Sequence, residues 1–453
     1  MIDPSHSKTP VGPRGLNLLK LLVGYYRHPL DTLANVTQKY GEVVLFKVSS
    51  YTVYQIVQPD HIKHVLQDNN RNYHMSGAFD QTRPVVGRGL STNEGESWLL
   101  HRRMMQPLFG RGQVAVFAPM IVEATAAMLE RWRTSVGTGR HLSIYPELLA
   151  LNHYILGKML FNIDVTGADR RVLSALSFVR AYTNERINAL VTVPSDWPTT
   201  RNLRFREAVT LLDDFAYGLI RDARAGNRTS DDMLSMLLNI RDEKTDEGLS
   251  DEELHDELMT LFFAAYEDPA NALCWALSLL THHREVEERL RAEIQTVLNG
   301  RPPTYEDLSA LVYTGAVIDE TLRLYPPTWS ILRDTVGDDV VGDYAIQSGS
   351  SVLVNLYLTH RLPEFWDEPD AFNPDRFLPE NSAGRPRYAY LPFGGGPRQC
   401  IGAALAVMQL KLTLAMLIQA YQYEWASAYP PSPNATHSLR PPPDVAVRLS
   451  PAK

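Results

Sequence analysis

The sequence is poor in cysteine, which limits the classes of protein it can belong to. Only Cys274 and Cys400 occur among 453 residues, so a disulfide framework is excluded and a reducing compartment is expected. Neither cysteine has a second one near it in the sequence, which argues against a zinc site built from thiolates. Each thiol is therefore expected to be a buried core residue or to act alone.

The sequence also lacks an excess of positive charge and a long apolar run near its start. The net charge is −8, so a general nucleic-acid-binding surface is not indicated. The most apolar early run, Leu16 to Tyr26, is too short to span a bilayer and carries Lys20. No signal-peptide layout is present. We therefore expect a soluble, cytoplasmic protein without membrane insertion and without a nucleic-acid partner.

The remaining composition is that of an ordinary globular protein. The hydrophobic fraction of 44% and the charged fraction of 21% both lie in the usual range. The length allows two or three domains or one large mixed domain.

Most of the chain shows helical periodicity, and strands are expected in two places. Residues 42–48 and 52–58 alternate β-branched and aromatic side chains and predict a hairpin. Short strand-like segments recur at 339–341, 344–346 and 351–356, and the chain closes with an expected edge strand from Val445 to Leu449. Residues 71–93 contain several glycines and a proline and are expected to form a long loop with apolar tips.

One stretch, from Leu391 to Gly402 (LPFGGGPRQCIG), has the composition of a functional loop. Three consecutive glycines followed by a proline exclude a helix or a strand there. The next residues are apolar nearly all round and predict a buried helix. Cys400 therefore lies just before a helix N-terminus, where free backbone N–H groups favour a thiolate.

A second stretch predicts a long helix with a break in its middle. Ser250 and Glu253 form a capping-box start, and helical character then continues to about His282. Pro269 has no N–H to bond the carbonyl of Ala265, so the helix is expected to open or bend there. Adjacent carboxylates at Glu267 and Asp268 would be costly in a buried helix unless they are paired or functional.

Together these motifs resemble the cytochrome P450 family. The spacing Phe393-x-x-Gly396-x-Arg398-x-Cys400-x-Gly402 is similar to the family's heme-ligand loop. Further motifs follow in the family's order: Trp98-x-x-x-Arg102, the broken helix around Asp268, Glu320-x-x-Arg323, and the FNPDRF segment that contains Arg376. The resemblance covers essentially the whole chain. It implies one α-rich heme domain (residues 1–453) with a β-rich lobe at about 40–60 and 325–395, without a fused reductase domain.

The resemblance also implies roles for individual residues. Cys400 would be the thiolate ligand of heme b, a mode of ligation that favours O–O cleavage. The other cofactor-binding residues implied are Phe393, Gly394, Arg398, Gly402, Trp98, His101, Arg102 and Arg333. Glu320, Arg323 and Arg376 would form a structural network behind the heme.

The broken helix departs from the family pattern in detail. The family usually has an acid followed by a threonine, whose hydroxyl helps to deliver protons to bound dioxygen. Glu267 fits the acid, and Asp268 then stands in place of the threonine; a shift of one residue instead puts Asp268 at the acid and Pro269 at the threonine. Under either alignment the hydroxyl is missing. Ala264, Glu267 and Asp268 are the catalytic candidates.

Three functions agree with these observations. The first is a monooxygenase that inserts oxygen into an apolar small molecule, with electrons from a separate ferredoxin or flavodoxin-type donor. A basic patch near Arg102, Arg103 and Arg111 would suit an acidic donor. The second is a peroxygenase that uses hydrogen peroxide, with Asp268 as general acid–base. The third is a heme sensor without turnover.

An apolar substrate pocket is expected, consistent with a fatty acid, a terpenoid or a polyketide. A monomer is the expected oligomeric state. The residues expected to line the pocket are Phe79, Val85, Val86, Phe263, Ala264, Ile331 and Leu332.

Overall fold

A computed structural model of the chain describes residues 7–48, 51–139, 141–167, 170–189, 192–227, 231–426, 432–435 and 438–452. They fold into two compact units, each built from separate stretches of the sequence. The first contains Met1–Ser76, Gly315–Ala403 and Ser432–Pro441, and the second contains Gly77–Thr314, Ala404–Pro431 and Pro442–Lys453. That the two units make one catalytic domain stays a prediction.

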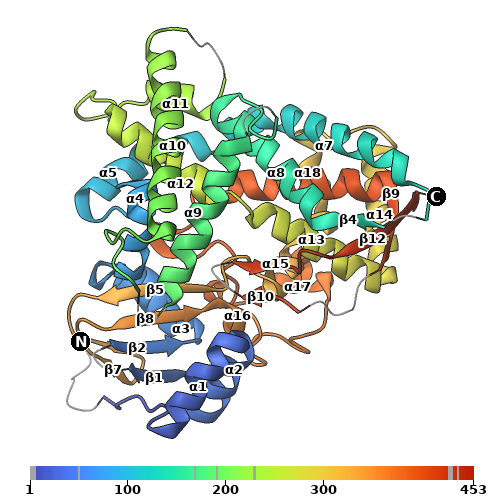
Figure 1. Cartoon of the computed structure of the whole chain (residues 1–453). Helices are drawn as coiled ribbons and strands as arrows, with labels where there is room; N and C mark the ends of the chain where they lie inside the picture. Colours follow the sequence, from blue (N-terminus) through green and yellow to red (C-terminus); the bar gives the residue numbers. More distant parts are fainter. Residues whose placement is uncertain are drawn as a thin grey trace. The chain divides into compact units, whose positions relative to one another are not determined.

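The first unit is organised around a mixed sheet with the strand order β1-β2-β8-β5-β3 (Figure 1). The expected hairpin is confirmed, since β1 and β2 pair antiparallel, whereas β2 and β8 pair parallel. Consecutive residues are buried in these strands because both faces of the sheet are covered: Val43 and Tyr54 belong to one core cluster, and Val44 and Phe46 belong to another. The strands are β1 (Val43–Val48), β2 (Tyr51–Ile56), β3 (Tyr73–Met75), β5 (Ser330–Thr335) and β8 (Ser351–Asn355).

Short helices and hairpins complete the first unit. The second helix ends at Gly41, whose φ of 100° suits glycine and whose N–H donates to the carbonyl of Thr37. The helices are α1 (Leu16–Arg27), α2 (Pro29–Tyr40), α3 (Pro59–Lys63), α16 (Leu356–Thr359) and α17 (Pro379–Ser382). The small hairpins are β6 (Asp339–Val341) with β7 (Tyr344–Ile346), and β10 (Asn434–Ala435) with β11 (Leu439–Arg440).

The second unit is mainly helical. Its core contains fully buried aromatic side chains, among them Phe161 and Phe262, whose rings meet edge to face at 5.5 Å. The helices are α4 (Arg83–Val86), α5 (Gly95–Met105), α6 (Arg111–Val114), α7 (Ala118–Trp132), α8 (Ile144–Phe161), α9 (Arg170–Asn188), α10 (Thr200–Arg224), α11 (Met233–Asn239), α12 (Asp251–Ala264), α13 (Asp268–His282) and α14 (Arg284–Leu298). Two helices continue from one unit into the other: α15 (Val312–Leu324) and α18 (Ala403–Ala420).

Two expectations about local structure are wrong. The strand near the C-terminal end, β12 (Ala446–Pro451), is not an edge strand, because it pairs with β4 (Leu142–Ser143) on one side and β9 (Tyr421–Trp425) on the other. Residues 71–93 are not one long loop: they contain β3, a 3₁₀ turn over Gly77–Thr82 and α4. The sequence does not reveal these elements, because glycines interrupt the stretch and each element is too short to give a periodic pattern.

Two helical stretches are long and apolar enough to cross a membrane by length and composition alone. They are residues 111–135 and Ala403–Ala420, and 44% and 61% of their respective apolar windows are buried within the protein. The core helix of a soluble protein passes the same test. The second stretch is α18, the buried helix that the sequence predicts after Cys400.

Candidate functional site

Cys400 lies at the end of a loop whose shape depends on glycine. The Cys400 N–H donates to the carbonyl of Phe393 at 2.9 Å, which closes the loop. Gly396 has a φ of +68°, and a Cβ there would lie 1.8 Å from the carbonyl oxygen of Leu66. Any side chain at 396 would therefore displace the loop. The Cys400 side chain is exposed and lies just before the first residue of α18.

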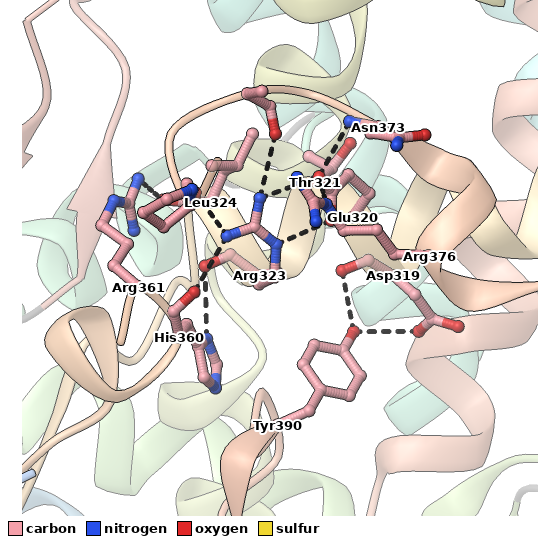
Figure 2. A network of polar contacts seen from close by, with 12 residues as sticks. Asp319, Glu320, Thr321, Arg323, Leu324, His360, Arg361, Asn373, Arg376 and Tyr390 are labelled. Atoms are coloured by element: carbon pink, nitrogen blue, oxygen red, sulfur yellow. Dashed lines mark hydrogen bonds and ion pairs between the residues drawn. The ribbon is translucent and has the colours of Figure 1, made fainter. Parts of the chain in front are cut away.

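A buried charge network stands beside this loop in the first unit (Figure 2). Arg323 donates to both carboxylate oxygens of Glu320 at 2.7 and 2.8 Å, and both side chains are fully buried. Its remaining bonds go to the carbonyls of His360, Pro369 and Ala371. Every N–H of this guanidinium therefore has an acceptor, which a buried charge needs.

The third predicted member of the network joins it more loosely. The Arg376 Nε lies 3.5 Å from the Glu320 Oε1 and forms an ion pair without hydrogen-bond geometry. The Arg376 Nη2 donates to the carbonyl of Glu368 at 3.1 Å, and the Asn373 N–H donates to Glu320 at 2.9 Å. The structure thus brings Glu320, Arg323 and Arg376 together as the resemblance implies; their role behind a heme stays a proposal.

His360 connects the network to the start of the cysteine loop, and sequence reasoning missed it. The Leu391 N–H donates to the His360 Nε2 at 2.9 Å, and the His360 Nδ1 lies 3.2 Å from the carbonyl oxygen of Arg323. The ring must therefore be neutral with its proton on Nδ1. Burial, together with the charge of Arg323, lowers the pKa of His360 to about 3.

Helix α5 carries the predicted Trp98, His101 and Arg102 on neighbouring turns. Trp98 and His101 are buried, and Arg102 is half-buried. His101 already has two carboxylate partners on α12, with Nδ1 2.7 Å from Glu257 and Nε2 3.3 Å from Glu253. The hydrogen bond to Glu257 raises the pKa of His101. The structure thus accounts for His101 as part of an ion-pair cluster, and its predicted role toward a cofactor stays a prediction.

The expected break in the long helix is present between α12 and α13. Residues 265–267 leave the helix, and Pro269 occupies the first turn of α13. The Asn152 Nδ2 on α8 donates to the carbonyls of Ala265 and Tyr266 at 2.9 and 2.8 Å. The Gln409 Nε2 on α18 in turn holds the Asn152 Oδ1 at 3.1 Å. Side chains therefore replace the helical bonds that the break removes.

The two acidic candidates at the break have different surroundings. Glu267 is buried and pairs with Arg180 of α9, whose Nη2 lies 3.0 Å from the Glu267 Oε1. The Arg180 Nη1 also donates to the carbonyl of Phe263. Asp268 is half-buried and is the first residue of α13, where the helix dipole favours a negative charge. Glu267 is thus fixed by an ion pair, and Asp268 is the more accessible carboxylate.

The predicted pocket residues divide by exposure. Phe263, Val85 and Val86 are buried, the last two in α4, which contacts α12. Phe79, Ile331 and Leu332 are half-buried, and Ala264 is exposed on α12. Ile331 and Leu332 belong to β5 in the first unit, and the other five belong to the second. Contact with a substrate stays a prediction for all of them.

Arg333, Arg398 and the second cysteine complete the set of predicted residues. Arg333 is buried on β5, and its Nη1 donates to the carbonyl of Leu332 at 3.0 Å. Arg398 is half-buried at the end of a 3₁₀ turn over Gly396–Arg398. Burial raises the pKa of the Cys274 thiol, which agrees with the expectation of an inert core residue.

The donor set fits a heme iron better than a metal held by protein side chains alone. Among the described residues no group of three or more histidine, cysteine or acidic side chains is placed to hold a metal ion. One exposed thiol on a glycine-shaped loop would supply a single bond to the iron, and a macrocycle would supply the others. Cys400 would therefore be the metal ligand, and arginines such as Arg398 suit the propionates.

The comparisons with known proteins agree with this geometry. The family model described as Cytochrome P450 matches residues 10–448. The cyclooctat-9-en-7-ol 5-monooxygenase of Streptomyces melanosporofaciens is 32% identical over 91% of this chain and 89% of its own length. Cyclooctatin synthase from the same organism is 32% identical over 99% of this chain and 95% of its own length. Pentalenene oxygenase of Streptomyces avermitilis is 32% identical over 87% of both chains.

A solved structure supports the fold. The cytochrome P450DA heme domain superposes with a TM-score of 0.89 over 98% of both chains, at 23% sequence identity. The predicted fold class is confirmed: a mainly helical chain with a smaller β-rich part. Heme b is the cofactor, and the activity is heme-thiolate oxygenation of an apolar substrate. The chain belongs to the cytochrome P450 family.

Proposed function

We propose that this protein is a monooxygenase that hydroxylates or epoxidises a cyclic terpenoid. The proposal rests on the similarity of this chain to three relatives, at 32% identity over 87–99% of the chain. Two of them are named for the oxygenation of cyclooctat-9-en-7-ol and of pentalenene, and the third is named cyclooctatin synthase. The apolar side chains Phe79, Ile331 and Leu332 support a hydrocarbon skeleton. Of the three substrate classes, a cyclic terpenoid is the one that these names favour.

The reaction needs two electrons from a separate protein. When bound, the heme supplies dioxygen activation through an iron that carries a thiolate ligand. One oxygen atom enters the substrate, and the other leaves as water with two protons and the two electrons. A ferredoxin or flavodoxin-type protein would supply the electrons. The chain would act as a monomer in the cytoplasm.

Different residues of the protein would bind the heme and exchange protons. Cys400 would hold the iron, and Arg398, Arg333 and Arg102 would neutralise the propionates. Ala264, which is small and exposed on α12, would leave room for the macrocycle. Glu267 is buried and paired with Arg180, and the half-buried Asp268 would be the carboxylate that exchanges a proton. These roles rest on family motifs and on the geometry within each unit.

The test combines a spectrum with an isotope experiment. The reduced, carbon-monoxide-bound protein should give the red-shifted Soret band of thiolate ligation, and Cys400→Ser should lose it. With a surrogate ferredoxin and its reductase, a cyclic terpene should gain one oxygen atom from labelled dioxygen. Turnover of a fatty acid or a macrolide, but not of the terpene, would overturn the substrate class. A normal spectrum without turnover of any of these compounds, either with dioxygen and the electron donor or with hydrogen peroxide, would favour a sensor.

A second function is favoured by the residue pair Asp268–Pro269. No threonine hydroxyl stands at the break, and a half-buried carboxylate occupies the start of α13. In a peroxygenase, Asp268 would take a proton from one oxygen of hydrogen peroxide and return it to the other, which leaves as water. The net reaction consumes one peroxide for each oxygen inserted and needs no electron donor.

Variants at 268 separate the two oxidants. Asp268→Asn removes proton exchange and should lower peroxide-driven turnover by about 10²–10⁴-fold. Asp268→Thr should restore donor-driven turnover while peroxide activity is lost. Glu285→Gln is the matched control, because Glu285 is an exposed acid in the first turn of the next helix. Unchanged peroxide activity in Asp268→Asn would remove the carboxylate role.

A further inference from the structure

Helix α1 presents a row of apolar side chains to solvent. Leu16, Leu19, Val23 and Tyr26 have exposed fractions of 77%, 59%, 51% and 61%. Their spacing of three, four and three residues places them along one face of the helix. We call these four residues the outer stripe. Exposed single apolar residues are common, but a continuous stripe of this kind marks an interaction surface.

The opposite face of α1 already has a partner. Leu21 and Tyr25 pack against a cluster that includes Leu30 and Leu33 of α2, and the two helices lie side by side (Figure 1). Gly24 allows the close approach, since a Cβ there would lie 3.0 Å from the Thr32 hydroxyl. The outer stripe is therefore not needed to pack α1 against α2, because the opposite face already does so.

The charged residues of α1 itself are all basic. Lys20 follows Leu16 by four residues and Arg27 follows Val23 by four, so both basic side chains border the stripe. No acidic residue occurs between Asp3 and Asp31, although the whole chain has a net charge of −8. Arg14 precedes the helix and is exposed. This concentration of positive charge suits an anionic surface.

The size of the stripe decides between a membrane and a second protein chain. A helix of this length extends about 18 Å, and only one narrow face of it is available. A stable interface between two chains needs about 1,200–2,000 Å² of buried surface, more than one such stripe can supply. Insertion to the headgroup boundary needs only an apolar face with basic residues at its edge.

We propose that α1 docks this protein on the surface of a membrane that contains anionic lipid. Leu16, Leu19 and Val23 enter the acyl boundary, Tyr26 lies at the headgroup level, and Lys20 and Arg27 contact the phosphates. The helix lies in the interface and does not cross the bilayer. Docking does not depend on the proposed substrate, although an apolar terpenoid concentrates in the same phase.

Vesicle sedimentation of the intact holoprotein tests the proposal. Binding is expected with vesicles of phosphatidylcholine and phosphatidylglycerol, and much less with phosphatidylcholine alone. The double variant Leu19→Gln/Val23→Gln should lower the partition coefficient roughly tenfold. Lys20→Gln/Arg27→Gln should lower binding to the anionic vesicles only. Ionic strength near 1 M, where the Debye length is about 3 Å, should have the same effect as the charge variant.

A matched control removes two other exposed apolar residues. Val116 and Val336 are 51% and 56% exposed and lie outside α1, so Val116→Gln/Val336→Gln should bind like the original protein. An unchanged carbon-monoxide spectrum in each variant verifies folding. Equal binding by Leu19→Gln/Val23→Gln, or no binding to anionic vesicles, would overturn the proposal. So would a dimer in sedimentation velocity that the same double variant abolishes.

Discussion

The cysteine loop and the α12–α13 break both leave regular structure, but different groups satisfy their backbones. In the loop, the N–H groups of Gly394 and Cys400 bond carbonyls of the same loop, those of Leu391 and Phe393. At the break, the free carbonyls are bound by side chains from α8 and α9, namely Asn152 and Arg180. The first solution is local in sequence. The second depends on helices that lie about a hundred residues earlier in the sequence.

The largest effect is expected where the loop's support is removed. Arg323→Leu leaves the buried Glu320 carboxylate with only the ion pair to Arg376 and the Asn373 N–H, which should cost about 3–5 kcal/mol of unfolding free energy. Urea unfolding measures the loss, and the heme-to-protein ratio should fall with it. Arg284→Leu, in an exposed pair with Glu288, should change neither quantity. Normal stability in Arg323→Leu would mean that the local bonds of the loop suffice alone.

A smaller effect is expected at the break. Asn152→Leu keeps the side-chain volume but leaves the carbonyls of Ala265 and Tyr266 without their donor, at a cost of about 1–3 kcal/mol. Hydrogen exchange should accelerate at the start of α13 before it changes elsewhere. Asn239→Leu is the control, because the Asn239 amide also donates to a carbonyl but is exposed. Equal exchange in the two variants would contradict the bracing role of Asn152.

The pH dependence of the free energy of unfolding tests the support that His360 gives to the start of the cysteine loop. The pKa of His360 is about 3 in the folded protein, whereas a histidine in the unfolded chain titrates near 6.5. Its neutral form therefore stabilises the fold above about pH 6.5, and this contribution is lost as the pH falls toward 3. Each pH unit in that window costs at most about 1.4 kcal/mol.

His360→Gln should flatten this slope. Urea unfolding at several pH values between about 6.5 and 4.5 measures the difference from the original protein. His153, whose pKa burial lowers to about 4, contributes a similar slope in both proteins and cancels in the comparison. Identical slopes would show that the His360 ring is already accessible to protons in the folded state.

The smallest effect is expected at the start of α12. Ser250→Ala removes the capping box in which the Ser250 hydroxyl accepts from the Glu253 N–H, at a cost of about 1 kcal/mol. The carbon-monoxide spectrum should not change, because the loss is confined to the helix start. Ser309→Ala, at an exposed hydroxyl that donates to the Glu306 carbonyl, should have a smaller effect. A spectral change in Ser250→Ala would mean that the α12 start influences the thiolate ligand.

The same contrast explains what the sequence predicts well and what it hides. The loop, the pair Glu320–Arg323 and the hairpin β1–β2 are each encoded by residues close together, so their spacing is informative. Pro269 likewise predicts the break, because it acts on a carbonyl four residues away. Nothing in the spacing of Asn152 or Arg180 connects them to that break.

Other residues were hidden for a similar reason. His360 is separated from Arg323 and Leu391 by more than thirty residues on each side, and an isolated histidine has no motif. Its position between two recognised motifs is a signal in the sequence that could have pointed to it. The position of β12 inside its sheet was equally unreadable, since β4 contributes only Leu142–Ser143.

The contrast between the two thiols also provides a way to count loaded molecules. Cys274 is fully buried, and Cys400 is exposed. An alkylating reagent added to the folded protein should therefore react only at Cys400, and only in molecules whose sulfur is not bonded to iron. Intact-mass measurement of the alkylated fraction would then give the proportion of cofactor-free protein directly, without any extinction coefficient.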